Sequence, residues 1–314
     1  MVSLCLNMIV RNEEKIITRC LDSVRSIVDF YLIVDTGSTD NTINIMKDYF
    51  EKNNLQAYIH QSTFYNFEHN RNEALKLCKG ICDYILLLDA DMVLKINNFN
   101  KDSLVKDCYN LIQKDVIYSY NNIRIIKNNL DFYYEGLTHE VMMIGTKSYD
   151  FLSEEDIYIE DVQDGGCKSS KIERDIYLLK EAIKKDPEND RNYFYLANTY
   201  FALGELKQAM EYYKKRIEFK GWNQELWYCF YKLGLIHFGL EEYEQGIINL
   251  LEAYNILPNR LENVYYIYLY YESTKRDNLK NLFLDIIKNT LTYSLKNENN
   301  LFVDHDLYSK MKLL

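Results

Sequence analysis

The sequence predicts two domains of different class: an α/β domain over residues 1–167, followed by an all-helical repeat domain over residues 168–314. Up to about residue 165, short apolar runs alternate with amphipathic stretches, as expected where strands and helices take turns. After about residue 170 the strand signals fade and helical periodicity takes over. The Gly165-Gly166 pair marks the predicted boundary.

Length and composition favour two folded cores. The chain has 314 residues, of which 47% are hydrophobic and 27% charged, so extensive disorder is not expected. A net charge of −10 argues against broad binding to nucleic acid or to an anionic membrane. No apolar run approaches the roughly 20 residues that span a bilayer. Seven cysteines without a C-x-x-C pair fit a reducing compartment, and we therefore expect a cytoplasmic protein.

The elements of the first domain follow in order. Leu4 to Val10 is predicted to be a buried strand rather than a leader peptide, because no basic segment precedes it and charged residues follow at once. Ser38, Thr39 and Asp40 are possible caps of the second helix. Further strands are expected at 31–34, 56–60 and 84–88, and helices at 13–24, 39–52 and 68–79.

The second domain shows a tetratricopeptide-like repeat. The small residues Gly204, Gly234 and Gly246 fall where paired helices of such repeats cross, and stacked pairs bury a shared core. A leading helix at 173–185 and a last pair at 262–288 would flank the repeats. We expect this domain to bind a polypeptide or glycan acceptor or to mediate a homodimer, and the sequence leaves these alternatives open. The repeat is marked by Ala182 with Pro187, Arg216 with Gly221, and Ala253 with Pro258.

An acidic pair is the sharpest local feature. The apolar run Tyr84–Leu88 ends in Asp89-Ala90-Asp91. Two carboxylates at the end of a buried strand are costly to keep charged unless a cation compensates them. Oxygen ligands suit Mg²⁺ or Mn²⁺, which would in turn bridge a diphosphate. The alternative is that the pair only caps a helix or lines a loop.

Three more strand-to-helix corners are expected at the same edge of the sheet, where open α/β sheets place their ligands. The segment 35–42 follows the second strand; in it Gly37 permits a tight turn, and Asp35 can accept a hydrogen bond from a base or a ribose. The segment 10–14 follows the first strand. Asn70-Arg71-Asn72 supplies a guanidinium suited to phosphate.

Taken together, these residues resemble glycosyltransferase family 2 with a GT-A nucleotide-sugar-binding fold, in particular members with C-terminal tetratricopeptide repeats. The resemblance spans nearly the whole chain. Its longest and most specific string is Ile33 to Thr42. The other strings that carry it are 8–14, 21–24, 70–75 and 88–91.

The resemblance implies roles for individual residues. Val10, Arg11 and Glu13 at the first corner, together with Asp35, would hold the nucleobase and ribose. Arg71, Asp89 and Ala90 would assist nucleotide binding. Asp91 would be the principal ligand of a Mn²⁺ or Mg²⁺ ion, with Asp89 as a further ligand.

The string Tyr134 to Glu140 looks like the family's His-Glu element near the acceptor side. His139 would complete the metal shell or orient the pyrophosphate, and Glu140 would take the proton from an acceptor hydroxyl. Family members often carry another histidine before the linker, where this chain has Asp161 and Asp164. Asp164 is therefore a second candidate for the base, and whether it or Asp161 is a ligand, a base or only a turn former stays open.

The implied activity is metal-dependent, inverting transfer of a sugar from a nucleotide-diphosphate sugar, with UDP as the expected nucleotide, to a hydroxyl of a glycan or protein. One rival is a catalytically inactive scaffold whose helical repeats bind a partner. A second rival is a sugar-phosphate nucleotidyltransferase, which needs a glycine-rich loop after the first strand. Residues 11–14 contain no glycine, which argues against that second rival.

Overall fold

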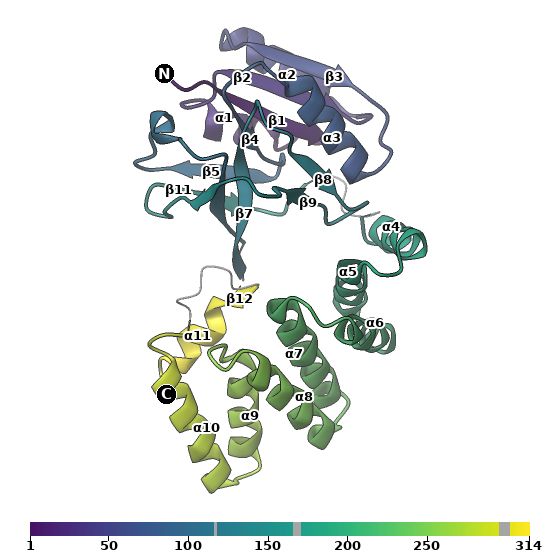
Figure 1. The fold of residues 1–314 in the computed structure, drawn as a ribbon, viewed down its shortest axis with the longest axis vertical. Helices are drawn as coiled ribbons and strands as arrows, with labels where there is room; N and C mark the ends of the chain where they lie inside the picture. Colours follow the sequence, from purple (N-terminus) through teal and green to yellow (C-terminus); the bar gives the residue numbers. More distant parts are fainter. Residues whose placement is uncertain (116–117, 166–170, 295–301) are drawn as a thin grey trace. The chain divides into compact units, whose positions relative to one another are not determined.

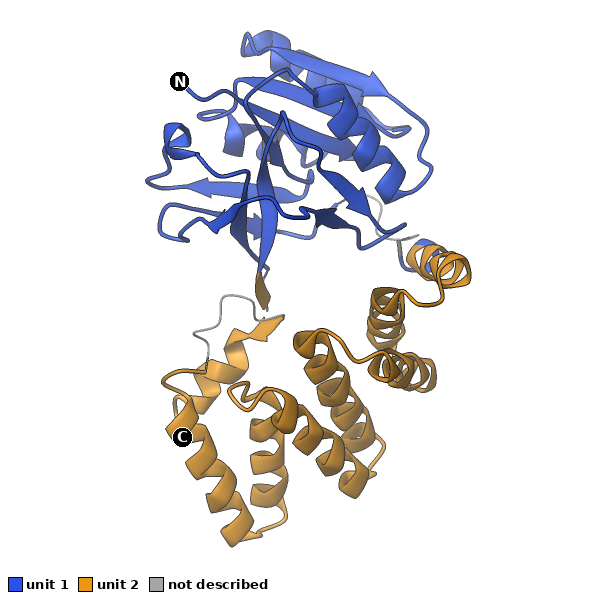
Figure 2. Cartoon of the chain, in the orientation of Figure 1, with its two compact units in different colours: residues 1–116, 121–174 blue, residues 117–120, 175–314 orange. Residues whose placement is uncertain are grey.

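The structure is a computed structural model that describes residues 1–115, 118–165, 171–294 and 302–314 (Figure 1). It divides into two compact units, one of residues 1–116 and 121–174, the other of residues 117–120 and 175–314 (Figure 2). The predicted boundary between residues 167 and 168 lies outside the described residues. The α/β class of the first unit and the helical class of the second are confirmed.

A mixed sheet organises the first unit. Its strands follow the order β3-β2-β1-β4-β7-β6-β11-β5, and β10 pairs with β6. The first four strands in this order are parallel, whereas β7 pairs antiparallel to β4 and β11 antiparallel to β5. A separate ribbon joins β8 to β9. The strands are β1 Leu4–Val10, β2 Phe30–Asp35, β3 Ala57–Gln61, β4 Tyr84–Leu87, β5 Met92–Ile96, β6 Cys108–Lys114, β7 Tyr118–Lys127, β8 Tyr133–Glu135, β9 Val141–Met143, β10 Tyr149–Phe151 and β11 Ile157–Asp161.

Helices cover both faces of the parallel part of this sheet. Alternate residues of a strand point to opposite faces, so Leu6 of β1 lies in one core with residues of α1 and α2, while Cys5 lies in another with residues of α3. Both faces are therefore closed to solvent, and the loops at the strand ends are left to carry function. The helical elements of this unit are α1 Ile17–Val24, α2 Thr42–Lys52, α3 Phe67–Cys78 and the 3₁₀ turn η1 Lys101–Ser103.

Two helices begin later than the sequence predicts. The first starts at Ile17 rather than residue 13, and the second at Thr42 rather than residue 39. The backbone N–H of Glu13 donates to Thr42 Oγ1 (2.8 Å), and that of Glu14 donates to Asp40 (3.2 Å). Because these groups bond to one another across the sheet edge, the segments before both helices are held as loops.

The second unit consists mainly of paired helices. Gly234 on α7 and Gly246 on α8 lie at a helix crossing: a Cβ on either would meet the other's carbonyl oxygen at 3.2 Å. The predicted use of small residues at this crossing is confirmed for Gly234 and Gly246. For Gly204 the prediction is wrong: this residue lies in the turn after the helix 190–202, with a φ of 76° and nothing within 4 Å of a Cβ. The short strand β12 Val303–Asp304 pairs with Tyr118 and Ser119 of β7. The helices are α4 Lys171–Lys185, α5 Asp190–Ala202, α6 Leu206–Glu218, α7 Asn223–Gly239, α8 Tyr243–Ile256, α9 Glu262–Ser273, α10 Asp277–Thr290 and α11 His305–Met311.

Among the described residues, no helix combines the length and the apolar character that crossing a membrane requires.

Candidate functional site

Two predicted corners and the acidic pair lie at one edge of the sheet. Val10, the last residue of β1, is in register with Asp35, the last residue of β2. On the other side of β1, Asn7 is in register with Leu87 of β4, two residues before Asp89. Because the three strands are parallel neighbours, the loops that follow them project from the same edge.

The loops after β1 and β2 are bonded to each other. The N–H of Asn12 donates to Ser38 Oγ (2.9 Å), and the N–H of Thr39 donates to Asn12 Oδ1 (2.7 Å). The Val10 carbonyl accepts from the N–H of Thr36 (2.9 Å). Asn12 has a φ of 56°, a left-handed conformation that asparagine tolerates better than most residues. Ser38 and Thr39 therefore fix the first corner instead of capping α2, whose N-cap residue is Asn41.

Asp35 keeps one carboxylate oxygen without a partner. Its side chain is 1% exposed, and its Oδ1 accepts from the N–H groups of Gly37 and Ser38, both at 3.0 Å. The buried Oδ2 has no hydrogen-bond partner among the described residues. A buried acceptor is costly to leave unsatisfied, so this oxygen marks the place where a ligand donor group fits.

Arg71 holds two acidic side chains. Its Nη2 donates to Asp89 Oδ1 (2.7 Å), and its Nε donates to Glu140 Oε1. Its guanidinium also lies 5.5 Å from the ring centroid of Tyr134. Burial alone would lower the pKa of Arg71, but the Asp89 and Glu140 carboxylates outweigh burial and hold that pKa well above its usual value. The structure thus joins three residues that the sequence assigned to separate motifs.

A second arginine extends this network, and the sequence analysis missed it. Arg124 on β7 is 7% exposed, and its Nη1 lies 3.9 Å from Asp89 Oδ2. Its Nη2 donates to Gln113 Oε1 (2.6 Å), and Gln113 Nε2 donates to Asp161 Oδ2 (2.8 Å). Burial raises the pKa of Asp161, while the Gln113 hydrogen bond and Arg124 oppose that rise. The sequence feature that could have identified Arg124 is its place between two isoleucines in a strand.

The turn that carries Glu140 is bonded to α3. The N–H of Gly136 donates to Glu68 Oε2 (2.8 Å), and the N–H of Phe67 donates to the Leu137 carbonyl (3.2 Å). Gly136 has a φ of 116°, which favours glycine. His139 is exposed and has a φ of 51°. Residues on α3 therefore position both Arg71 and its acidic partner Glu140.

Asp91 and Glu13 come together beside Gly165. A methyl group on Gly165 would lie 3.2 Å from Asp91 Oδ2 and 3.2 Å from Glu13 Oε1. The Asp91 carbonyl accepts from the N–H of Val162 (3.1 Å), just after β11. Glycine at 165 thus leaves space directly next to two carboxylates.

Asp164, the second predicted base, is paired with Arg19 of α1. Arg19 donates through both terminal nitrogens, Nη1 to Oδ2 (2.7 Å) and Nη2 to Oδ1 (2.6 Å). Both side chains are more than a third exposed. Of the nucleotide-binding residues predicted around this edge, Arg11 is exposed and Ala90 is buried.

Residues 5–160 match the family described as Glycosyl transferase family 2. The N-terminal domain belongs to glycosyltransferase family 2. Residues 170–253 match a repeat family described as Anaphase-promoting complex, cyclosome, subunit 3, and the second unit is tetratricopeptide-like.

Individual proteins are similar to parts of this chain. The glycosyltransferase SunS of Bacillus subtilis is 25% identical over 233 residues, which are 69% of this chain and 54% of SunS. The chain thus spans about half the length of that relative. A TPR repeat-containing protein of Synechococcus elongatus is 41% identical over 90 residues, 29% of this chain and 20% of that protein. The structure of Staphylococcus aureus TarS 1–349 aligns with a TM-score of 0.43 at 17% identity, covering 81% of this chain and 91% of TarS 1–349.

The predicted metal ligands of the glycosyltransferase domain stay a prediction. The described residues contain no group of three or more His, Cys, Asp or Glu side chains placed to hold a metal ion, and this does not test the expected set of Asp91, Asp89 and His139. Asp89 is engaged by Arg71 and lies near Arg124. Asp91 and Glu13 still offer oxygen donors side by side. Such a pair suits Mg²⁺ or Mn²⁺, which usually take one or two carboxylates and complete their shell with phosphates and water.

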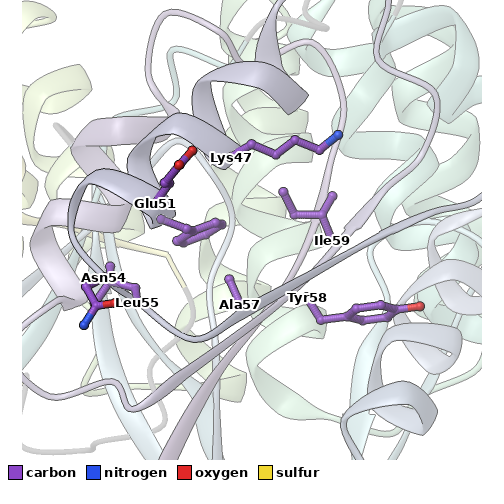
Figure 3. A pocket seen from close by; sticks show the side chains of 8 residues that line it. Lys47, Glu51, Asn54, Leu55, Ala57, Tyr58 and Ile59 are labelled. Atoms are coloured by element: carbon purple, nitrogen blue, oxygen red, sulfur yellow. The ribbon is translucent and has the colours of Figure 1, made fainter.

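A hollow of about 420 Å³ lies elsewhere on the glycosyltransferase domain, between α2 and β3 (Figure 3). Its lining includes Lys47, Glu51, Tyr58 and Ile59, and none of the predicted site residues. The candidate site is therefore formed by the loops that follow β1, β2 and β4, and not by this hollow.

Proposed function

We propose that this chain transfers a sugar from a nucleotide-diphosphate sugar, with UDP as the nucleotide, to a hydroxyl of a glycan or protein acceptor, with inversion at the anomeric carbon. Membership of the first domain in glycosyltransferase family 2 supports sugar transfer. The single observation that carries nucleotide binding at this edge is Asp35 Oδ2, a buried acceptor without a partner among the described residues. An N–H donor of a nucleobase such as uracil would satisfy it.

The chain's own groups prepare the edge for an anionic donor. The loops after β1 and β2 are cross-bonded, so the loop segments beside Asp35 are preorganised and little ordering is needed on binding. Arg71 and Arg124 supply positive charge next to Asp89 in a molecule whose net charge is −10. A divalent cation bound at Asp91 and Glu13 would add charge that stabilises a leaving diphosphate.

Three carboxylates compete for the role of general base. Glu140 and Asp164 are engaged by arginines, which draw electron density from their oxygens. Asp161 is bonded by a neutral amide instead, and burial raises its pKa, which makes it a better proton acceptor. It also lies at the end of β11, in register with Met92, the neighbour of Asp91. We therefore assign the base to Asp161, in preference to Glu140 and Asp164.

The experiment compares hydrolysis of a panel of nucleotide sugars by the wild-type chain and by Asp91→Asn, with Mn²⁺ and with chelator. We expect Mn²⁺-dependent hydrolysis of one donor, reduced at least about a hundredfold in Asp91→Asn. Asp131→Asn is the matched control, because the Asp131 side chain is 92% exposed and its ion pair is with exposed Lys79. If the wild-type chain neither hydrolyses nor binds any of the donors, the result would favour the alternative that the protein is a catalytically inactive scaffold.

A further inference from the structure

The strand β3 forms an edge of the sheet that lacks the usual protection against pairing. Among the described strands it pairs with β2 alone and ends the strand order. Its residues, Ala57–Gln61, include no lysine, arginine, carboxylate or proline. The strand at the other end of the order, β5, carries Lys95 in an ion pair with Glu160 (2.8 Å). Proteins usually protect an exposed edge with charges, prolines or bulges, because its free peptide groups can pair with another strand. The β3 edge is therefore open to a further strand.

The peptide groups at this edge alternate in direction. The carbonyl of Gln56 accepts from the N–H of Tyr31 (2.9 Å), and the N–H of Ser62 donates to the carbonyl of Asp35 (2.8 Å). Successive residues of a strand direct their N–H and C=O groups to opposite sides, so the even-numbered residues of β3 face β2. The odd-numbered residues 57, 59 and 61 face outward, with Ile59 at their centre. A second β3 strand would thus pair antiparallel about a twofold axis, with the two Ile59 residues opposite each other.

This arrangement also matches the side chains on both faces of β3. On one face Tyr58 would lie opposite His60 of the second copy, and such cross-strand pairs stabilise a sheet. On the other face Ile59 packs against the core and borders the hollow of about 420 Å³ between α2 and β3 (Figure 3). A second copy would cover the apolar part of that hollow, which includes Phe50 and Leu55.

The charges beside the hollow are complementary to a second copy of themselves. Lys47 and Glu51 lie one turn apart on α2, and both are exposed and border the hollow (Figure 3). In a twofold pair the two α2 helices run antiparallel, so Lys47 of each copy faces Glu51 of the other. The helix carries two lysines and two carboxylates, which makes it neutral in a chain of net charge −10. Two copies therefore meet here without the repulsion that the net charge causes elsewhere.

We propose that the β3 edge is a self-association surface, on which a second copy of this chain adds its own β3 strand antiparallel and extends the sheet across a dimer. The contact belongs to the glycosyltransferase domain, and not to the helical repeats for which the sequence left a homodimer open. The inference does not depend on the donor chemistry proposed above. Its test therefore needs no transferase activity.

Analytical ultracentrifugation of the full chain over a concentration series tests the proposal by charge reversal. The wild type should form a dimer of twice 37.6 kDa. Lys47→Glu and Glu51→Lys each place like charges opposite one another at two contacts, so each should weaken self-association at least about tenfold. Both side chains are exposed, so the variants should fold as the wild type does. The double variant Lys47→Glu/Glu51→Lys restores both ion pairs and should associate within about threefold of the wild type.

The control variant is Lys52→Glu, because Lys52 is exposed on the same helix but is not part of the lining of the hollow. It should leave the dimer intact. Hydrogen exchange then locates the contact: the amides of Ala57, Ile59 and Gln61 should exchange at least about tenfold more slowly in the dimer than in the Lys47→Glu monomer.

Three results would overturn the proposal. The first is a wild-type chain that stays monomeric at every concentration, which would leave the β3 edge to a different partner. The second is a dimer that both single reversals leave intact, or a double variant that associates no better than the single ones. The third is a dimer in which the amides of Ala57, Ile59 and Gln61 exchange as fast as in the monomer.

Discussion

Asp35 and Lys232 are residues whose burial makes little sense for stability alone. Among the described residues, Asp35 keeps a buried oxygen without a partner, and the Lys232 side chain is 7% exposed with its ammonium group held only by ring contacts and longer-range electrostatic interactions. Each lies in an otherwise well-bonded part of its own unit. Residues that violate local rules in this way are concentrated at functional sites, because ligands supply what the fold leaves out.

Replacing Asp35 with Asn tests the first of these residues. The amide oxygen can still accept from Gly37 and Ser38, but an NH₂ group replaces the acceptor Oδ2. We expect UDP binding, measured by calorimetry, to weaken about ten- to a hundredfold, the loss of one hydrogen bond to a charged group. The melting temperature should stay the same or rise. Unchanged affinity for UDP would contradict the role of Asp35.

Arg71→Met would leave Asp89 and Glu140 partly buried without their shared cation. Since breaking a buried ion pair is costly and these groups retain some exposure, we expect the free energy of unfolding to fall by about 2–3 kcal/mol. Lys79→Met removes an exposed ion pair just after the same helix and should cost less than about 0.5 kcal/mol. Urea denaturation measures both. Similar losses in the two variants would show that Arg71 does not hold the network.

The stability of the chain should depend on pH through Lys232. Burial lowers the pKa of Lys232 from 10.5 to about 8, while the unfolded chain keeps the ordinary value. Between these two pKa values the unfolded state binds more protons than the folded state. The free-energy cost of burying the charged Lys232 side chain is therefore full below about pH 8 and is relieved as the pH rises toward 10.5. The stability difference between Lys232→Met and wild type should shrink by about 2 kcal/mol from about pH 7 to about pH 9.5. A constant difference in urea denaturation would be evidence against this shift.

At the scale of elements, the sequence predicted the regular parts well. Residues 4–10, 31–34 and 84–87 are strands as expected, because their apolar runs are buried on both faces of a parallel sheet. The helix pairs followed from the small residues at their crossings. The later strands β5 to β11 were not placed individually, because they lack the continuous apolar run that marks the buried parallel strands.

The site was predictable where single loops carry it and less so where distant elements meet. Asp35, Arg71 and Asp89 stand in motifs that follow strands or open helices, and the structure places them at one edge. Arg124, Gln113 and Asp161 come from β7, β6 and β11, and only the strand order brings them together. A single sequence carries no signal for that order. The roles of Val10, Arg11, Glu13 and His139 in ligand binding stay predictions.

The crossing of α7 and α8 provides a test at the same scale. A Cβ on Gly246 would lie 2.2 Å from the ring of Phe238 and 3.2 Å from the Gly234 carbonyl oxygen. Gly246→Ala should therefore lower the free energy of unfolding by about 1–3 kcal/mol through overpacking. Gly239→Ala, where nothing lies within 4 Å, is the control and should be neutral or stabilising. If thermal melts followed by circular dichroism show the same change in stability for Gly246→Ala and Gly239→Ala, the two helices do not cross as closely as described.

At the scale of the whole molecule, charge opposes the proposed donor. The net charge of −10 repels an anionic nucleotide sugar at long range, while Arg71 and Arg124 attract it only locally. Salt screens the long-range part first. We expect the association rate of UDP, measured by stopped flow, to rise about twofold between about 20 and 150 mM NaCl. A falling rate would mean that the local positive groups dominate the approach.

The chain's compartment remains a prediction. The described cysteines Cys5, Cys20, Cys78, Cys82, Cys108 and Cys229 are all free thiols. This is compatible with the reducing, cytoplasmic environment expected from the sequence, and Cys167 lies outside the described residues.

The most direct measurement is an experimental structure of the chain with a UDP-sugar and Mn²⁺. We predict that the nucleobase lies at Asp35 and donates an N–H group to Oδ2, and that the diphosphate and the metal ion lie next to Asp91 and Glu13. A nucleotide bound in the hollow between α2 and β3, or a diphosphate remote from Asp91, would contradict the account.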